Sequence, residues 1–431
     1  MAAESCHPRG LSWFARSCIP ADPARHIAVP IPISAASTTK PPASDAEEES
    51  PISALPDELL LECLARVPRA SLPALPAVCR RFAALLASEG FLHLRRAHGR
   101  LRPCLLAVSV SSAHFARALL QLQLGASSVP ELDVAALPLP SLLHCAGSSS
   151  SSAFAHARAV ALGRDVYLIG RGATLRVDAL TGAARACAPT LFPRKKFAAA
   201  AVGGRIYVAG GSARTAAVEE YDPSVDAWRV VAEAPRRRYG CAGAGAGGVF
   251  YVAGGVAVSS GGDGSGGAAT RAHACAGSVD ALHVASGAWA WSARPRAVPG
   301  GGCVVGACGA GDGHLYVVAS HAVDLSFWRW NGGVNRGGGG GGPCGWVALE
   351  APPVPRGLVG LGMAVRVAMA GVGGDRVTAV VNATAVRGHN AAGGGALEGM
   401  VLVYDIGGGK WSRAPDLPPG FRRAACAAVE C

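Results

Sequence analysis

The chain has 431 residues, a formal net charge of +11, and a composition that is 50% hydrophobic but only 6% aromatic. This length predicts two or three domains, and no apolar run approaches the roughly 18 residues that a membrane span needs. The basic residues form no run of five and show no zinc-finger spacing, so the charge indicates an acidic protein partner rather than nucleic acid or a membrane.

Residues 1–50 are rich in Pro, Ser and Ala and lack hydrophobic periodicity, which predicts a disordered arm. The most apolar patch of this arm, Leu11–Cys18, is an incidental feature or, alternatively, a short docking or targeting motif. No secretory signal is visible, and the 14 cysteines contain no CxxC pair. We therefore expect a protein of the cytoplasm, the nucleus or both, with reduced cysteines and no zinc site.

Residues 51–99 predict a small set of short helices. Pro56 suits the first turn of a helix, Asp57 and Glu58 place negative charge at its positive end, and Pro68 ends it. Two apolar stripes have helical spacing, and they consist of Leu60, Cys63, Leu64 and Val67, then Val78, Phe82, Leu85 and Leu86. Helices this short lack a self-sufficient core, so some apolar surface should stay open for a partner. The alternative is a plain helical hairpin packed on the next domain.

Residues 101–431 contain a repeated pattern that predicts a ring of small antiparallel sheets. Its clearest unit has a Gly203–Gly204 turn, a strand that ends in Gly210–Gly211, then Tyr221 and Trp228. The glycines permit positive φ and close backbone packing. The aromatic residues should fill the space between neighbouring sheets, because one sheet cannot bury both of its faces alone. Five units keep all or part of this order and begin near Phe154, Pro193, Pro235, Pro299 and Pro355.

The two ends of the repeat region decide the number of sheets. Segments 104–110, 115–122 and 129–134 predict three strands, and the tail 422–430 has the small-residue pattern of a first strand. Together these segments would form a split sheet that closes the ring. We predict six sheets, with five as the alternative.

Two sets of motifs resemble known families. The words LPDELLLECLARVP and VCRRF resemble an F-box, the helical motif that docks onto the Skp1 adaptor of cullin-based ubiquitin ligases. The glycine doublets with a later Tyr and Trp, at intervals of roughly fifty residues, resemble the kelch repeat. Across residues 52–431 the chain is similar to plant F-box/kelch-repeat proteins. The resemblance implies a small all-α F-box (51–99) followed by an all-β kelch β-propeller (101–431), which together with the disordered arm (1–50) predicted from composition gives a multidomain fold.

This resemblance implies the substrate-recognition subunit of an SCF-type (Skp1–cullin–F-box) E3 ubiquitin ligase, whose propeller binds the protein to be ubiquitinated. The partners would be a Skp1-like adaptor, cullin-1 through that adaptor, and an unknown substrate, which the chain would position without bond chemistry of its own. A kelch-propeller scaffold or interaction protein without a ligase role is the alternative. The residues that would face Skp1 or hold the F-box together are Leu55, Pro56, Leu59, Leu60, Leu64, Val67, Pro68, Val78 and Phe82.

The connections from a fourth strand to the next first strand should emerge on one face of the propeller, and they carry many basic residues. Arginine recognises carboxylates through paired hydrogen bonds, which suits a substrate with an acidic surface. Solvated loops without a binding role are the alternative. The candidate substrate-binding residues, which Lys195 and Lys196 accompany, are Arg194, Arg214, Arg236, Arg237, Arg238, Arg356, Arg422 and Arg423.

The sequence contains no convincing catalytic or metal-binding pattern. Gly243, Gly245 and Gly248 fit GxGxxG, but a strand pattern rather than a helix follows them. HExxH, Walker A and GxSxG patterns do not occur, and the 12 histidines show no metal-ligand spacing. Some kelch propellers are copper oxidases, which would need Tyr and His ligands that converge on the axis. Only seven tyrosines exist and several hold repeat positions, so we expect no enzyme activity, no cofactor and no metal.

Overall fold

The computed structural model describes residues 51–52, 54–110, 115–122, 132–137, 153–257, 275–290, 296–321, 324–331, 345–355, 363–385, 397–421 and 423–431. The chain divides into two compact units, Met1–Ala54 and Leu55–Cys431, and the description below concerns the second unit. The predicted arm over residues 1–50, with its Leu11–Cys18 patch, lies outside the described residues.

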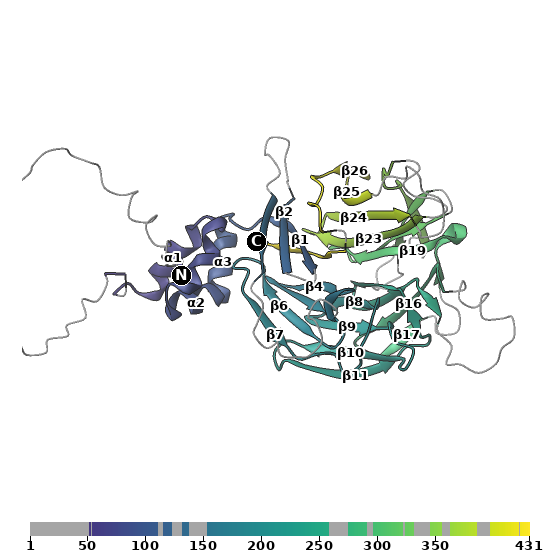
Figure 1. Ribbon diagram of the computed structural model, residues 1–431, viewed down its shortest axis with the longest axis horizontal. Coiled ribbons are helices and arrows are strands. Elements are labelled where there is room, and N and C mark those ends of the chain that lie inside the picture. The colour runs from purple at the N-terminus through teal and green to yellow at the C-terminus, as the bar shows by residue number, and fades with distance from the viewer. Residues whose placement is uncertain are drawn as a thin grey trace, which may run out of the picture. The chain divides into compact units, whose positions relative to one another are not determined.

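Four short helices open this unit, as the apolar stripes predict (Figure 1). They are α1 (Asp57–Arg66), the 3-10 helix η1 (Arg69–Ala77), α2 (Arg80–Ala87) and α3 (Glu89–Ala97). Ser88 begins α3, because its hydroxyl oxygen accepts a hydrogen bond from the amide of Phe91 at 3.2 Å. Arg95 is buried and donates to the carbonyl oxygens of Ala65 and Val67 at 3.2 and 2.8 Å, which satisfies the carboxyl end of α1.

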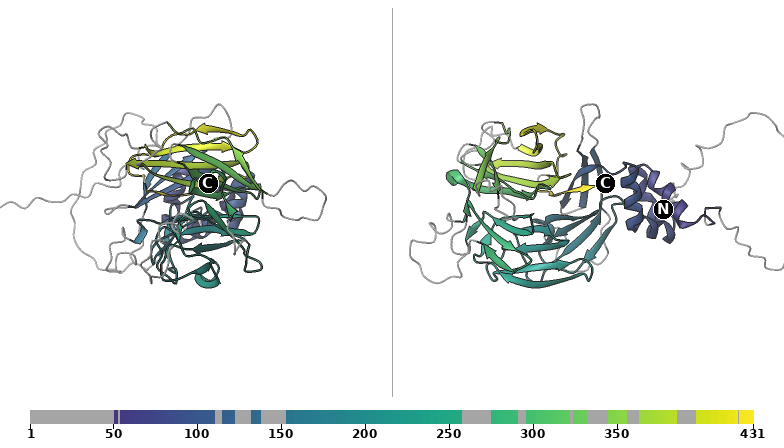
Figure 2. Two further views of the ribbon diagram at one scale, coloured as in Figure 1. Left: turned by 90° about the vertical axis from the view of Figure 1, so that its right-hand side faces the viewer. Right: turned by 180° about the vertical axis from the view of Figure 1, so that it is seen from behind.

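The rest of the unit consists of antiparallel sheets around a common axis (Figure 1 and Figure 2). Each sheet is given from its innermost strand outwards. The first consists of β27 (Ala425–Glu430), β1 (Pro103–Val110), β2 (Phe115–Gln121) and β3 (Leu132–Ala136), and the second of β4 (Arg158–Leu162), β5 (Asp165–Ile169), β6 (Thr174–Asp178) and β7 (Ala184–Cys187). The third consists of β8 (Ala198–Val202), β9 (Arg205–Ala209), β10 (Ala217–Asp222) and β11 (Ala227–Glu233).

The other three sheets follow the same plan. The fourth consists of β13 (Ala242–Ala246), β14 (Val249–Ala253), β16 (Ser278–His283) and β17 (Ala288–Ala290), with β18 (Arg296–Ala297) paired to β16. The fifth consists of β19 (Cys303–Gly309), β20 (Leu315–Ser320), β21 (Leu325–Asn331) and β22 (Gly345–Leu349). The sixth consists of β23 (Met363–Val372), β24 (Arg376–Ala385), β25 (Leu397–Asp405) and β26 (Lys410–Arg413). Two small elements complete the propeller, and they are the ribbon β12 (Arg238–Tyr239) with β15 (Val256–Ala257), and η3 (Pro299–Gly301).

The split sheet closes the ring, which confirms the prediction of six sheets over the alternative of five. Strand β27 from the carboxyl end pairs with β1, so that Leu105 lies opposite Ala428. The innermost strands then contact one another in a closed circle in the order β27, β4, β8, β13, β19, β23. The outermost strand of the split sheet, β3, covers Leu132–Ala136, and residues 129–131 of the predicted segment 129–134 lie outside the described residues.

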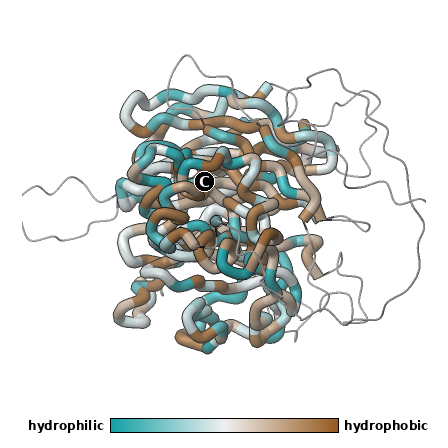
Figure 3. Tube along the Cα trace, turned by 90° about the vertical axis from the view of Figure 1, so that its left-hand side faces the viewer, coloured by the Kyte–Doolittle hydropathy of each residue, from teal (hydrophilic) through white to brown (hydrophobic). Residues whose placement is uncertain are grey.

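The repeat aromatics lie between neighbouring sheets, as the pattern predicts. Tyr221 is buried, and its ring lies 5.5 Å from the ring of Tyr167 in the preceding sheet and 5.0 Å from that of Trp228. The indole N–H of Trp228 donates to the carbonyl oxygen of Ala188 at 2.8 Å, again toward the preceding sheet. Hydrophobic and hydrophilic residues alternate over short distances along the trace (Figure 3). Middle strands such as β14 are buried along their whole length, because neighbouring sheets cover both of their faces.

The helical domain and the first sheets share one core. A single hydrophobic cluster includes Leu60 and Phe91 of the helices together with Leu106 of β1 and Leu168 of β5. Polar contacts reinforce it, since Arg164 donates to a carbonyl of α2 at 2.5 Å. The helices therefore do not need a self-sufficient core, because part of their apolar surface is covered by the sheets.

Candidate functional site

From the start of α1 to the end of α3, the helical domain exposes two large apolar side chains. Leu59 in α1 is 55% exposed, and Val78, which directly follows η1, is 64% exposed. Cys63 and Arg66 are exposed and lie four and seven residues after Leu59, so they share its face of α1. We call Leu59, Cys63, Arg66 and Val78 the outer residues of the helical domain. Exposed apolar side chains on a small domain suit a protein partner.

The nine residues predicted to contact the adaptor or to hold the domain together divide into two groups. Leu60 and Leu64 are buried, and Val67 and Phe82 pack against the same cluster, so these four hold the domain together. The burial of Leu60 and Leu64 fits the second of their two predicted roles, holding the domain together, and adaptor contact by any of the nine residues stays a prediction. Half-buried Leu55 joins the exposed members, which are Pro56, Leu59, Pro68 and Val78.

Arg194 and Arg238, two of the predicted substrate contacts, lie in the interior instead. Their side chains are fully buried. Each lies four residues before an innermost strand and pairs with a buried carboxylate on the third strand of the same sheet. The guanidinium of Arg194 lies 2.6 Å from Glu219, and that of Arg238 lies 2.7 Å from Asp280. Both arginines therefore hold a sheet together and cannot reach a partner.

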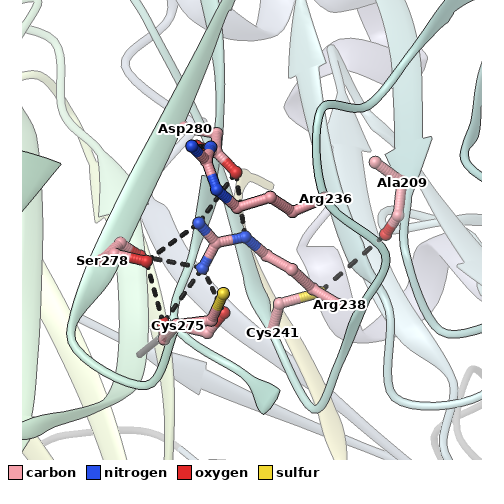
Figure 4. A network of polar contacts seen from close by, with 8 residues as sticks. Ala209, Arg236, Arg238, Cys241, Cys275, Ser278 and Asp280 are labelled. Carbon is pink, nitrogen blue, oxygen red and sulfur yellow. Dashed lines mark hydrogen bonds and ion pairs between the residues drawn. The ribbon is translucent and has the colours of Figure 1, made fainter. Parts of the chain in front are cut away.

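The contacts of Arg238 show what this interior arginine does (Figure 4). It donates to Asp280 at 2.9 Å, to the carbonyl oxygen of Gly254 at 2.8 Å and to the hydroxyl of Ser278 at 2.9 Å. Gly254 has a φ of 69°, and a Cβ there would lie 2.8 Å from the Cβ of Val304. The glycine doublet thus presents a carbonyl to the arginine where no other residue fits.

The remaining predicted arginines have varied surroundings. Arg236 lies 2.5 Å from Asp280, Arg237 is half-buried, and Arg214 is exposed. Arg423 is exposed and lines a cavity at the axis of the ring. Two further predicted positions lie outside the described residues, and they are Arg356 and Arg422.

This axial cavity measures about 440 Å³. All six innermost strands contribute residues at or just before their first positions, so the connections from fourth to first strands emerge on one face. Most of the lining is Ala, Val and Gly, and no described lining residue carries a carboxylate. Its basic side chains are His156, Arg158, Lys196, Arg366 and Arg423.

The two arginines on the strands themselves are partly desolvated. Arg158 donates to the carbonyl oxygens of Phe197 and Cys241 at 2.7 and 2.9 Å, which uses two of its five N–H donors. Burial, followed by the charge of Arg366, lowers the pKa of Arg158 to about 10. Within the described part of the chain, Arg366 makes neither a hydrogen bond nor an ion pair, and burial and the charge of Arg423 lower its pKa.

The rim of the axial cavity is also cationic. Lys196 is exposed, and its ammonium lies 5.6 Å from the ring centre of Tyr239. Burial is the largest cause that lowers the pKa of His156 to about 4, and Lys195, Lys196, Arg366 and Arg423 lower it further. At neutral pH, His156 is therefore an uncharged donor or acceptor beside four formal positive charges.

Sequence reasoning missed Arg158 and Arg366 because it looked for basic residues in loops. Both lie within innermost strands made of small apolar residues, in the words HARAVAL and MAVRVAM. A lone arginine in such a strand is the signal that could have revealed them. Its side chain must leave the small-residue packing and enter the axis of the ring.

The helical domain lies at the opposite end of the innermost strands. A second hollow there is lined by Leu92 and Arg96 of α3 and by Gly163, Gly373 and Glu430, which follow or end β4, β23 and β27. Arg96 and Glu430 form an ion pair at 2.9 Å. Strand β27 runs from Ala425 at the axial cavity to Glu430 at the second hollow, and its six residues span about 17 Å.

In the described ranges, no three His, Cys, Asp or Glu side chains come together in a way that could hold a metal ion. No helix among the described residues is both long and apolar enough to cross a membrane.

Comparisons with known proteins agree with this architecture. The F-box domain model matches residues 52–94, which contain α1, η1, α2 and the first two thirds of α3. The kelch motif model matches residues 193–235, which is the unit with the clearest repeat pattern.

Three relatives from Arabidopsis thaliana carry the description F-box/kelch-repeat protein. One is 43% identical over 435 residues and covers 99% of this chain and 100% of the relative. A second is 30% identical over 206 residues, with 45% of this chain and 73% of the relative covered. A third is 28% identical over 209 residues, with 44% and 51% covered. With both domain types in place and one relative aligned from end to end, the chain belongs to the plant F-box/kelch-repeat proteins.

Proposed function

We propose that the chain is the substrate-recognition subunit of an SCF-type E3 ubiquitin ligase. The F-box binds a Skp1-like adaptor and, through it, cullin-1, while the propeller binds the protein to be ubiquitinated. The chain itself contributes positioning, which raises the local concentration of substrate lysines near the charged ubiquitin-conjugating enzyme. It would carry out this role in the cytoplasm, the nucleus or both, without a catalytic residue, cofactor or metal of its own.

The exposure of the outer residues is the observation that carries this proposal. The F-box buries Leu60 and Leu64 but leaves Leu59 and Val78 in contact with solvent. Full burial of such a side chain is worth about 1.5–3 kcal/mol. A domain that keeps two of them exposed beside a well-filled core is suited to bind a partner there.

The arrangement of the two ends supports a positioning role. The F-box shares its hydrophobic cluster with the sheets, so a hinge between the two domains would have to open a packed core. The axial cavity lies at the far end of the innermost strands from the F-box. An adaptor on the F-box and a substrate at the axial cavity would therefore not compete for the same surface.

Capture of purified Skp1 by the full chain tests the proposal. We expect the double variant Leu59→Asp, Val78→Asp to lose Skp1 binding by at least tenfold while the thermal unfolding curve stays unchanged. The matched control is Val230→Asp, because Val230 is 48% exposed on the outermost strand β11, and it should bind Skp1 normally. Failure of the unaltered chain to bind Skp1 would instead leave a propeller scaffold without a ligase role.

A further inference from the structure

We infer that the axial cavity binds the phosphoryl group of a phosphorylated protein segment. The anion site stands on its own geometry, whereas the identification of the segment as a ubiquitination substrate rests on the function proposed above. The chemistry required is that of a phosphate monoester held by two strand arginines at the bottom and by lysine and arginine at the rim.

The charge balance of the axial cavity is the first argument. Four cationic side chains, Arg158, Lys196, Arg366 and Arg423, line it together with the neutral His156, and the described lining offers no carboxylate. Elsewhere in the propeller, buried arginines such as Arg194 and Arg238 have carboxylate partners. A desolvated cation without a counterion is unfavourable, so the missing negative charge is expected from a ligand.

Several N–H groups of the two strand arginines have no acceptor among the described residues. Arg158 uses two N–H groups on carbonyl oxygens, and Arg366 has no hydrogen-bond partner among the described residues. A carboxylate brings one negative charge and two oxygens, whereas a phosphorylated side chain brings a charge of about −1.5 to −2 and three acceptor oxygens. The number of open donors and of uncompensated charges fits the phosphoryl group better.

The size of the hollow and its rim favour a protein segment over a free anion. A volume of about 440 Å³ far exceeds that of one phosphate, and it falls in the usual range for a ligand site. Its walls are mostly alanine, valine and glycine, which can cover the apolar part of a side chain that enters the cavity. Lys196 and Arg423 are exposed at the rim, where neighbouring residues of the same segment would pass.

The test measures binding of peptide pools by the full chain in isothermal titration calorimetry. One degenerate pool has phosphoserine fixed at its centre, a second has serine, a third has glutamate, and inorganic phosphate is a fourth probe. We expect the phosphoserine pool to bind at least tenfold more tightly than the other three. Equal binding of the phosphoserine and serine pools would overturn the inference. Inorganic phosphate that binds as tightly as the phosphoserine pool would overturn the part that assigns a protein segment.

Two variants locate the binding. Arg366→Gln and, separately, Arg423→Gln should each weaken the phosphoserine pool at least tenfold. Arg185→Gln is the matched control, because Arg185 is exposed on the outermost strand β7 and its loss removes the same charge. An equal effect of all three variants would place the binding outside the axial cavity. Skp1 capture by the same preparations is scored separately, so loss of the ligase proposal and loss of the anion site give different results.

Discussion

Replacement of Arg238 by methionine tests whether this residue is structural, as its contacts indicate, or a substrate contact, as its place in the sequence suggests. Its guanidinium is fully buried, and it joins the carboxylate of Asp280 to the carbonyl of Gly254 in the glycine doublet. Methionine keeps most of the apolar length of the side chain but removes the charge and every donor. The change therefore isolates the polar contacts.

The magnitude follows from the partners that remain. Removal of one member of a buried ion pair costs about 3–5 kcal/mol, because the other charge stays buried. Arg236 still lies 2.5 Å from Asp280, so the lower half of this range is expected. With an unfolding entropy of roughly 2.1 cal/mol/K per residue over Leu55–Cys431, about 3–4 kcal/mol corresponds to a fall in Tm of about 4–5 °C.

Differential scanning calorimetry of the full chain measures this fall. The matched control is Arg237→Met, since the neighbouring Arg237 is half-buried and, among the described residues, donates one long hydrogen bond, to the carbonyl of Ala213 at 3.3 Å. Its Tm should change by less than about 1 °C. A fall in Tm below 1 °C for Arg238→Met, or equal falls for both variants, would refute the structural role of Arg238.

Three further predictions follow from single positions. Gly254→Ala should lower the free energy of unfolding by at least about 2 kcal/mol in calorimetry, because the new Cβ would lie 2.8 Å from the neighbouring sheet and the backbone has a φ of 69°. Its control is Gly163→Ala, where φ is 60° but the space around the new Cβ is open, and the free energy of unfolding should fall by about 1 kcal/mol. Thermal melts of Leu60→Ala should show a loss of about 2–5 kcal/mol, and those of exposed Leu59→Ala less than about 0.5 kcal/mol. The pKa of His156 is about 4 in the folded protein, against 6.5 in the unfolded chain, so the unfolded chain takes up a proton at a higher pH. The contribution of neutral His156 to stability is therefore present above pH 6.5 and is lost as the pH falls toward 4. The Tm of His156→Gln should therefore fall less between pH 7 and pH 5 than that of the unaltered chain, and equal falls would contradict this.

The fold could be predicted from the sequence because its signals are local and repeat. The tail from Ala425 has the small-residue pattern shared by the innermost strands, and it occupies that place. One departure from the repeat also has a local cause. The doublet of the first complete sheet reads Gly170–Arg171, and only its first position is crowded, since a Cβ on Gly170 would lie 2.5 Å from the carbonyl oxygen of Ala153. Arg171 is exposed and has no positive φ, so a side chain fits there.

The site could be predicted only in part because the sequence does not give the direction of a side chain in a loop. Arg194 lies between the exposed Pro193 and Lys195, yet its own side chain points inward to Glu219, 25 residues later in the chain. Nothing in the run Pro-Arg-Lys-Lys separates the buried residue from its neighbours. Conversely, Arg366 lies within a strand of small apolar residues, and its place at the axis follows from closure of the ring.

The two classes of arginine in this propeller have different physical roles. Arg194 and Arg238 occupy equivalent places in consecutive sheets, each with a carboxylate and a glycine carbonyl, so the fold supplies all of their partners. Arg366 is partly desolvated, and the described part of the fold supplies no partner for it. An uncompensated charge lowers stability, and such residues persist mainly at functional sites. Arg366→Met should therefore raise the Tm of the ligand-free protein, whereas Arg238→Met lowers it, and this opposite sign separates a binding residue from a structural one in the same assay.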